Sequence, residues 1–197
     1  MASRAKIDVL MVGVGGQGII LASDILGAVA IAAGYDAKKS DVHGMAQRGG
    51  SVVSHVRIAE RVYSPLVAQG TVDYLLALEK LEAGRSADYL RPGGTAIVND
   101  LAIPPAAVSS GAQAYPSDET ILGLLRRNGG QAHLVPGQAI AVELGNQRVL
   151  NLVMLGYLST FLPFPVEVWD AAIADHVPAR FLELNRRAFA RGREAKM

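Results

Sequence analysis

The sequence predicts an α/β fold in which a mainly parallel sheet is flanked by helices and followed by a helical C-terminal third. Short apolar runs typical of buried strands alternate with longer runs whose apolar residues recur at helical spacing. The first such pair, Ile7–Val12 and Gln17–Ala33, is joined by a glycine-rich turn. Beyond Pro136 every expected element is helical. We expect a single domain over residues 1–197, with a sheet region over 1–136 and a helical region over 137–197.

The glycine turn has the spacing of a dinucleotide-binding fingerprint. Gly13, Gly15 and Gly18 fit G-x-G-x-x-G, in which the glycines permit the turn, a close backbone approach and tight helix–strand packing. Free N–H groups at the start of the next helix could also bind an anion. A Rossmann nucleotide site needs an acidic residue about 20 residues further on, and Asp36 lies there in a segment with few apolar residues. Gly16 and Gln17 also fill the turn, so packing or an interface is favoured over a dinucleotide.

The middle of the chain departs from simple strand–helix alternation. After a short strand or extended link at Asp36–Ser40, Ser51–Ile58 alternates well and is expected to form an antiparallel hairpin with Arg61–Pro65. The remaining sheet-region elements are expected to be a strand at Thr71–Leu78, a helix at Glu79–Tyr89, a turn at Pro92-Gly93-Gly94, strands at Thr95–Val98, Gln113–Tyr115 and Ala132–Val135, and a helix at Asp118–Arg127 capped by Ser117 or Asp118. The helical region is expected to contain Ala139–Leu144, Val149–Phe161, Glu167–Ala174 and Pro178–Arg191.

A polar, glycine-bearing segment separates the second and third expected strands. It reads Val42-His43-Gly44-Met45-Ala46-Gln47-Arg48-Gly49-Gly50, with neither helical nor alternating periodicity and too few apolar residues for core. Because ligand sites in such sheets lie at the carboxyl ends of strands, we expect this segment near the glycine turn. Arg48 could hold a carboxylate or phosphate, and Gln47 could donate and accept hydrogen bonds. The alternative is that both side chains tie the loop to its own backbone.

Composition excludes several classes of function. The 197 residues carry a net charge of +1, which gives no electrostatic case for nucleic acid or an anionic membrane as partner. The absence of cysteine rules out disulfides, thiolate-bound iron–sulfur clusters and a cysteine nucleophile in this chain. The polar start of the sequence is unlike a signal peptide, and the apolar window Val149–Phe164 is too short to span a bilayer comfortably. We therefore expect a cytoplasmic protein.

Other candidate groups have ordinary structural explanations. His43 and His55 lack matching carboxylates for a metal site, and Glu79 with Glu82 suits the start of a helix better than a catalytic pair. The basic C-terminal residues fit a solvated helix end, with a docking patch for an acidic partner as the alternative; they are Arg186, Arg187, Arg191, Arg193 and Lys196.

Several motifs together resemble one family. They are VGVGGQG at 12–18, HGMAQRGGSV at 43–52, HVR at 55–57, EKLEAGR at 79–85, Thr95–Asn99, and Asn185, Ala188 and Gly192 near the C-terminus. This set resembles the gamma subunit, or fused gamma domain, of the 2-oxoacid:ferredoxin oxidoreductases. Within that family it is most similar to the small (beta) subunit of indolepyruvate ferredoxin oxidoreductase. The resemblance covers nearly the whole chain, and it implies a Rossmann-like sheet.

The resemblance implies an accessory role. Thiamine diphosphate, Mg and 4Fe-4S clusters would lie on a large catalytic subunit that decarboxylates a 2-oxoacid and passes electrons to ferredoxin, with coenzyme A as a possible co-substrate. This chain would bind no cofactor itself and would be inactive alone. Its ligand or interface residues would be Gly13, Gly15, Gly16, Gln17, Gly18, His43, Gly44, Met45, Gln47, Arg48, Gly49 and Gly50. The alternatives are a stand-alone Rossmann-like nucleotide-binding oxidoreductase and a non-catalytic anion-binding module.

Overall fold

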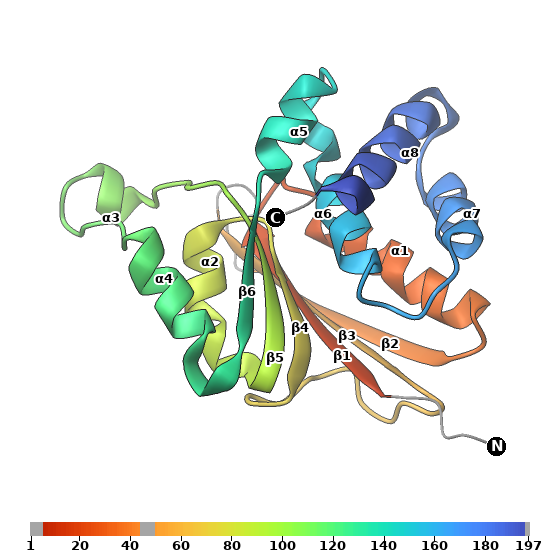
Figure 1. Ribbon diagram of the computed structural model, residues 1–197, viewed down its shortest axis with the longest axis horizontal. Coiled ribbons are helices and arrows are strands. Elements are labelled where there is room, and N and C mark those ends of the chain that lie inside the picture. Colours follow the sequence, from red (N-terminus) through yellow and green to blue (C-terminus); the bar gives the residue numbers. More distant parts are fainter. Residues whose placement is uncertain (1–5, 44–49, 196–197) are drawn as a thin grey trace.

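A computed structural model of the protein describes residues 6–43 and 50–195 (Figure 1). Its six-stranded sheet has the order β2-β3-β1-β4-β5-β6. The strands are β1 (Ile7–Val14), β2 (Asp36–His43), β3 (Ser51–Ala59), β4 (Val72–Ala77), β5 (Leu90–Asn99) and β6 (Gln131–Val135). The helices are α1 (Ile19–Ala32), α2 (Lys80–Arg85), α3 (Ala106–Ser109), α4 (Asp118–Leu125), α5 (Gly137–Glu143), α6 (Leu150–Ser159), α7 (Val166–His176) and α8 (Ala179–Glu194), with 3-10 turns η1 (Ala87–Tyr89), η2 (Arg127–Gly129) and η3 (Gln147–Val149).

The strand directions confirm the predicted fold class. Strands β1, β4, β5 and β6 are parallel to one another, whereas β3 is antiparallel to both β1 and β2. The four parallel strands end at one edge of the sheet, which we call the carboxyl edge. The helices α5 to α8 follow the last strand and form the predicted helical C-terminal part.

The predicted partner of the third strand is wrong. β3 forms its hairpin with β2, in a register that pairs Asp36 with Ala59 and His43 with Val52, and residues 61–65 form no strand. β2 is an edge strand, so its charged side chains can point away from the core. Two of them hold the connection after β3: the Asp36 carboxylate accepts from the Val62 N–H at 2.7 Å, and the Lys38 ammonium donates to the Val62 carbonyl at 2.6 Å.

Four smaller predictions also need correction. Residues 92–94 lie inside β5, as part of an irregularity in the ladder where Val72 faces Leu90 and Tyr74 faces Thr95. Residues 113–115 form no strand, and the expected helix over 79–89 is divided into α2 and η1 around Ser86. The first helix begins at Ile19, because Gly18 has a φ of 81°, outside the helical range. Ser117 caps α4 as predicted, with its hydroxyl accepting from the Thr120 N–H.

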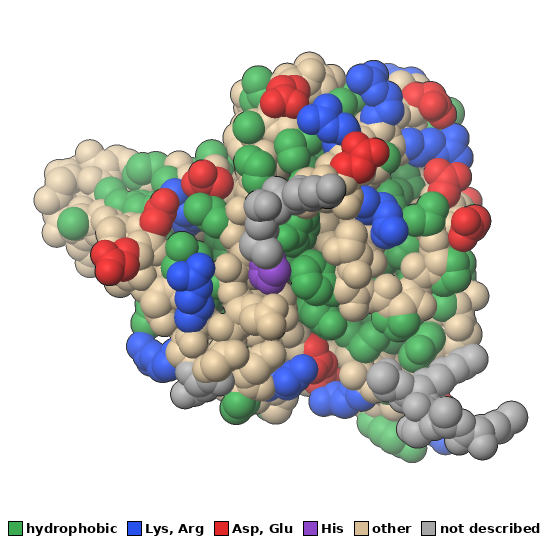
Figure 2. Space-filling view, viewed as in Figure 1, with side chains coloured by type: hydrophobic (Ala, Val, Ile, Leu, Met, Phe, Trp, Pro, Cys, Tyr) green, Lys and Arg blue, Asp and Glu red, His purple; other side chains and the backbone are tan. Residues whose placement is uncertain are grey.

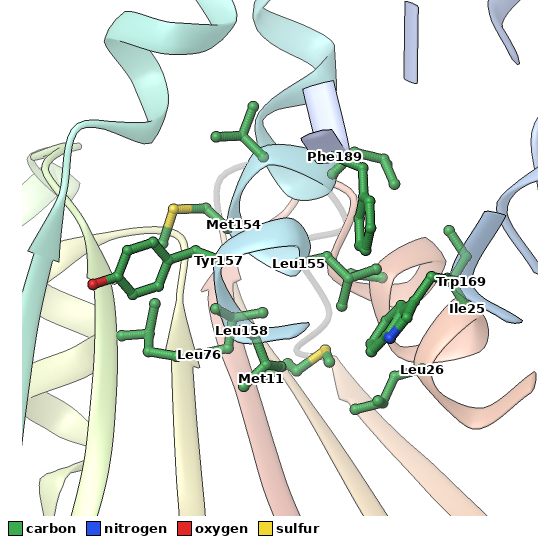
Figure 3. Close-up of a cluster of buried hydrophobic side chains, with 14 of the residues drawn as sticks. Met11, Ile25, Leu26, Leu76, Met154, Leu155, Tyr157, Leu158, Trp169 and Phe189 are labelled. Carbon is green, nitrogen blue, oxygen red and sulfur yellow. The ribbon is translucent and has the colours of Figure 1, made fainter. Parts of the chain in front are cut away.

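Helices cover the two faces of the sheet with separate apolar clusters. Helices α1, α6 and α7 lie on one side, and α2 and α4 on the other (Figure 1). Figure 3 shows the larger cluster, in which Met11 and Leu76 of the sheet meet Leu155 and Leu158 of α6. Trp169 of α7 is fully buried there, beside the Phe189 ring of α8 at a centroid distance of 5.4 Å. The C-terminal helices therefore share one core with the sheet.

Two glycines let α6 and α8 touch through their backbones. A Cβ on Gly192 would overlap the Val153 carbonyl, and a Cβ on Gly156 would overlap the Phe189 carbonyl. Each glycine thus admits the backbone of the other helix. Close packing of α8 on α6 therefore requires glycine at position 192 of the C-terminal motif.

None of the helices in the described part of the chain is both long and apolar enough to cross a membrane.

Candidate functional site at the carboxyl edge

The glycine turn is filled by its own glutamine. The Gln17 Oε1 accepts from the Val14 N–H at 2.7 Å, and its Nε2 donates to the Leu78 carbonyl at 3.1 Å. A Cβ on Gly13 would lie 2.7 Å from that Oε1, so the first glycine makes room for the glutamine. The turn between β1 and α1 is thereby fixed to the end of β4.

An asparagine network extends the same edge across the sheet. Asn99, at the end of β5, is fully buried and donates from Nδ2 to the same Leu78 carbonyl at 3.1 Å. Its Oδ1 accepts from the Gln138 N–H in the first turn of α5 at 2.9 Å. Gln17 and Asn99 therefore lock the ends of β1, β4 and β5 together through one carbonyl.

The third fingerprint glycine approaches α6. Gly18 would place a Cβ 2.6 Å from the Asn151 Nδ2, and that nitrogen donates to the Gly18 carbonyl at 3.2 Å. The N-terminal end of α1 has no side-chain cap and no acidic residue in its first turn. This helix start is thus anchored from the C-terminal part of the chain.

The end of the polar segment meets the glycine turn. The Gly15 N–H donates to the Gly50 carbonyl at 2.8 Å. His43 ends β2 opposite Val52. The other candidate residues of this segment, Gly44, Met45, Gln47, Arg48 and Gly49, lie outside the described residues. The structure therefore brings Gly50 to Gly13–Gly18, as expected from the order of strands.

Two hollows flank the turn. One, of about 380 Å³, is lined mainly by backbone and apolar groups, including Val14, Ile20 and Val52. The other, of about 360 Å³, lies between Gly16, Gln138 and Arg148. The Ile20 side chain is 42% exposed at the first of these.

The geometry opposes an ordinary dinucleotide site. β2 runs in the same direction as β1, and Asp36 stands at its beginning. Because the glycine turn follows the end of β1, the Asp36 carboxylate lies at the opposite edge of the sheet. β3 also separates β2 from β1. A ribose bound near Gly13–Gly18 would not reach Asp36. The acidic residue that the fingerprint requires is therefore not supplied from this position.

The paired glutamates have structural roles. Glu79 caps α2 by accepting from the Glu82 N–H at 2.9 Å, and it also accepts from the Tyr115 hydroxyl and the Ile103 N–H. Glu82 accepts from the Ser51 hydroxyl at 2.6 Å and from Arg85. Burial, together with the hydrogen bond to Glu79, raises the pKa of Tyr115. These bonds tie α2 to β3 and to the connection before α4.

The buried histidines act as packing and hydrogen-bonding groups. His55 accepts from the Val67 N–H at 3.3 Å, and His133 bonds to the Tyr157 hydroxyl at 3.1 Å. Burial lowers the pKa of both imidazoles. No group of His, Cys, Asp or Glu side chains suited to a metal ion is found within 6–43 and 50–195.

Two arginines of the basic C-terminal helix, Arg186 and Arg191, are paired with acidic neighbours, and Arg193 donates to the Ser159 hydroxyl. Arg186 makes two hydrogen bonds of 2.7 Å to Asp170 and one of 3.0 Å to Glu183, while Arg191 binds Glu143. Figure 2 shows acidic and basic side chains interspersed over the upper right, where α7 and α8 lie in Figure 1. This arrangement favours the solvated-helix interpretation over a basic docking patch.

We predict that Gln17→Ala lowers the free energy of unfolding more than the same substitution of an exposed glutamine does. The change removes the acceptor of the Val14 N–H at the half-buried end of β1 and leaves the Leu78 carbonyl with one donor fewer, a cost of about 1–3 kcal/mol in the free energy of unfolding. Urea denaturation measures this loss. The matched control is Gln147→Ala, because the Gln147 side chain is exposed and has no hydrogen bond to another described residue. Equal midpoints for the two variants would contradict the assigned role.

Comparison with known proteins identifies the family. The protein-family model described as pyruvate ferredoxin/flavodoxin oxidoreductase matches residues 8–195 of the chain. The chain is 38% identical over 191 residues to "Indolepyruvate oxidoreductase subunit IorB" of Thermococcus kodakarensis and 37% identical to its namesake in Pyrococcus horikoshii, with 95% of each chain covered. The solved gamma subunit of a keto/oxoacid ferredoxin oxidoreductase from Geobacter sulfurreducens is 27% identical with a TM-score of 0.70, over 95% of this chain and 96% of that one.

Fold and carboxyl edge together thus define a gamma-type domain of the 2-oxoacid oxidoreductases. The chain belongs to the pyruvate ferredoxin/flavodoxin oxidoreductase family. The resemblance stated from the motifs is confirmed. Sequence reasoning included Asn99 only as the last residue of the Thr95–Asn99 motif, without a role, and it missed Asn151, whose single amide carries no periodic or motif signal.

Proposed function

We propose that this chain is the small, cofactor-free subunit of an enzyme that oxidatively decarboxylates indolepyruvate or another aryl pyruvate and reduces ferredoxin. The similarity to two indolepyruvate oxidoreductase subunits at 37–38% identity, over 95% of each chain, supports this substrate class. The chain has no cysteine for an iron–sulfur cluster. We therefore assign thiamine diphosphate, Mg and the 4Fe-4S clusters to a large catalytic partner in the cytoplasm, with coenzyme A as co-substrate.

The carboxyl edge is the face that we assign to the large partner. The observation that carries this assignment is the 2.8 Å hydrogen bond from the Gly15 N–H to the Gly50 carbonyl. It joins the glycine turn to the end of the segment from His43 to Gly50, so that two motifs distant in sequence contribute to one surface. The exposed Ile20 and the hollow beside Val52 give this surface an apolar centre.

Arg48 is the residue of this surface to which we assign a charged contact. A guanidinium binds carboxylate or phosphate through two parallel hydrogen bonds, which suits a 2-oxoacid, a diphosphate or a carboxylate of the partner. Arg48 lies outside the described residues. The assignment rests on its place in the segment that ends at Gly50.

Reconstitution with the large subunit tests the function. The chain alone should show no aryl-pyruvate-dependent reduction of ferredoxin, and the reconstituted complex should show it. Loss of the charged contact in Arg48→Ala should lower turnover at least about tenfold, equivalent to about 1.4 kcal/mol. Arg127→Ala is the control, because Arg127 is exposed in η2, at the opposite end of β6 from the carboxyl edge. Full turnover and full assembly with Arg48→Ala would remove the assignment of Arg48, and turnover by the chain alone would remove the proposed function.

A further inference from the structure

A separate cavity of about 180 Å³ lies between the first turn of α1, the start of α6 and the start of α8. Its apolar walls are Leu21, Val149, Val177, Pro178, Phe181 and Leu184. Apolar protein cavities of about 150 Å³ are large enough to hold a benzene ring. The size and lining of this cavity therefore suit one flat ring system.

One cation at the cavity makes no ion pair with the described part of the chain. Arg148 lines it, and the backbone N–H of Arg148 donates to the Asn146 Oδ1 at 3.0 Å. Its guanidinium makes no ion pair or hydrogen bond with any residue in 6–43 or 50–195. An arginine beside an apolar cavity supplies a permanent positive charge and a planar set of donors, which match a carboxylate.

Two buried asparagines supply acceptors at the same cavity. Asn151 is 2% exposed and Asn185 is 7% exposed, and both line it. The Asn151 Nδ2 donates to the Gly18 carbonyl at 3.2 Å, and the Asn185 Nδ2 donates to the Phe181 carbonyl at 2.8 Å. Because a carbonyl can only accept, these contacts fix which end of each amide is nitrogen.

One of these amide oxygens is buried without a partner among the described residues. It is the Asn151 Oδ1, whereas the Asn185 Oδ1 is not a buried unsatisfied atom. Buried acceptors are normally satisfied, so an unpaired one at a cavity-lining residue indicates a missing donor. A ligand that completes it must carry an N–H or O–H.

We propose that this cavity binds a compact aromatic carboxylate with a ring N–H. The ring lies between the apolar walls, the carboxylate pairs with Arg148, and the N–H donates to the Asn151 Oδ1. The lining of the cavity defines this ligand class. The class includes the indolepyruvate of the proposed function, but the site is a second one, on this chain, and does not depend on which 2-oxoacid the enzyme uses.

Isothermal titration of the full chain with three matched probes tests the proposal. Indole-3-acetate carries ring, carboxylate and N–H; 1-methylindole-3-acetate lacks the N–H; indole lacks the carboxylate. We expect indole-3-acetate to bind at least tenfold more tightly than either of the others. Arg148→Gln should weaken indole-3-acetate at least tenfold, while the exposed Arg127→Gln should leave its affinity unchanged.

Three results would overturn the proposal: no binding of indole-3-acetate at millimolar concentration, equal affinity for the three probes, or wild-type affinity in Arg148→Gln. The comparison among probes uses the unaltered protein, so it does not depend on the folding of a variant. The titration contains no large subunit, so its failure would leave the reconstitution result intact, and the reverse also holds.

Discussion

Gly192→Ala is expected to lower the free energy of unfolding by about 3 kcal/mol or more. The added methyl group would overlap the Val153 carbonyl, which is backbone and cannot rotate away. Relief requires α8 to move off α6, and that movement would open the cluster around Trp169 and Phe189. Gly156→Ala should have the same effect from the other helix, because its methyl group would overlap the Phe189 carbonyl.

Urea unfolding followed by tryptophan fluorescence measures this effect, because Trp169 is the single tryptophan and is fully buried. The matched control is Gly27→Ala within α1, where a Cβ would meet nothing within 4 Å. Alanine is favoured over glycine inside a helix by about 1 kcal/mol, so this control should be neutral or stabilising. A Gly192→Ala protein with the wild-type midpoint would show that α6 and α8 do not pack through their backbones.

Ile20→Lys is expected to weaken binding to the large subunit by about 2 kcal/mol, roughly 30-fold, with little effect on folding. Ile20 is 42% exposed and lines the hollow beside the glycine turn, so a lysine can reach solvent in the free chain. In the complex its charge would be buried against the partner without a counter-charge. Binding affinity for the large subunit measures the effect, with the thermal midpoint as the check on folding.

Ile31→Lys is the control for this prediction. Ile31 is 60% exposed on the same helix, at the end away from the glycine turn. Ile31→Lys changes the net charge by the same amount as Ile20→Lys but should leave the affinity for the large subunit unchanged. If Ile31→Lys weakened binding and Ile20→Lys did not, the partner would contact the opposite end of α1.

The sequence predicts those parts of the fold that depend on local pattern. The buried strand, glycine turn and helix at 7–32 follow from composition and spacing, and the cap at Ser117 follows from one side chain. The predicted partner of β3 is wrong, although both candidates, residues 36–43 and 61–65, are its neighbours in sequence. The charged residues Asp36 and Lys38 make the first of these segments unlike a buried strand, and in the structure they bind the backbone of Val62 from an edge strand.

The candidate site is also predicted only in part. Glycine spacing identifies the turn and the polar segment, and the structure joins them through Gly15 and Gly50. The motif gives no sign that Gln17 folds back on Val14 and Leu78, or that Asn99 shares the Leu78 carbonyl. Such amide contacts depend on which strands are neighbours, and the linear sequence does not contain that information directly.

Hydrogen–deuterium exchange of the free chain and of its complex with the large subunit tests the central claim most directly. We expect new protection at residues 13–20 and 50–52, which form the glycine turn and the hollow beside it. Residues 57–66, at the opposite edge of the sheet, should exchange equally in both samples. Protection confined to 57–66, with none at the glycine turn, would contradict the claim that the carboxyl edge is the surface this chain offers to a catalytic partner.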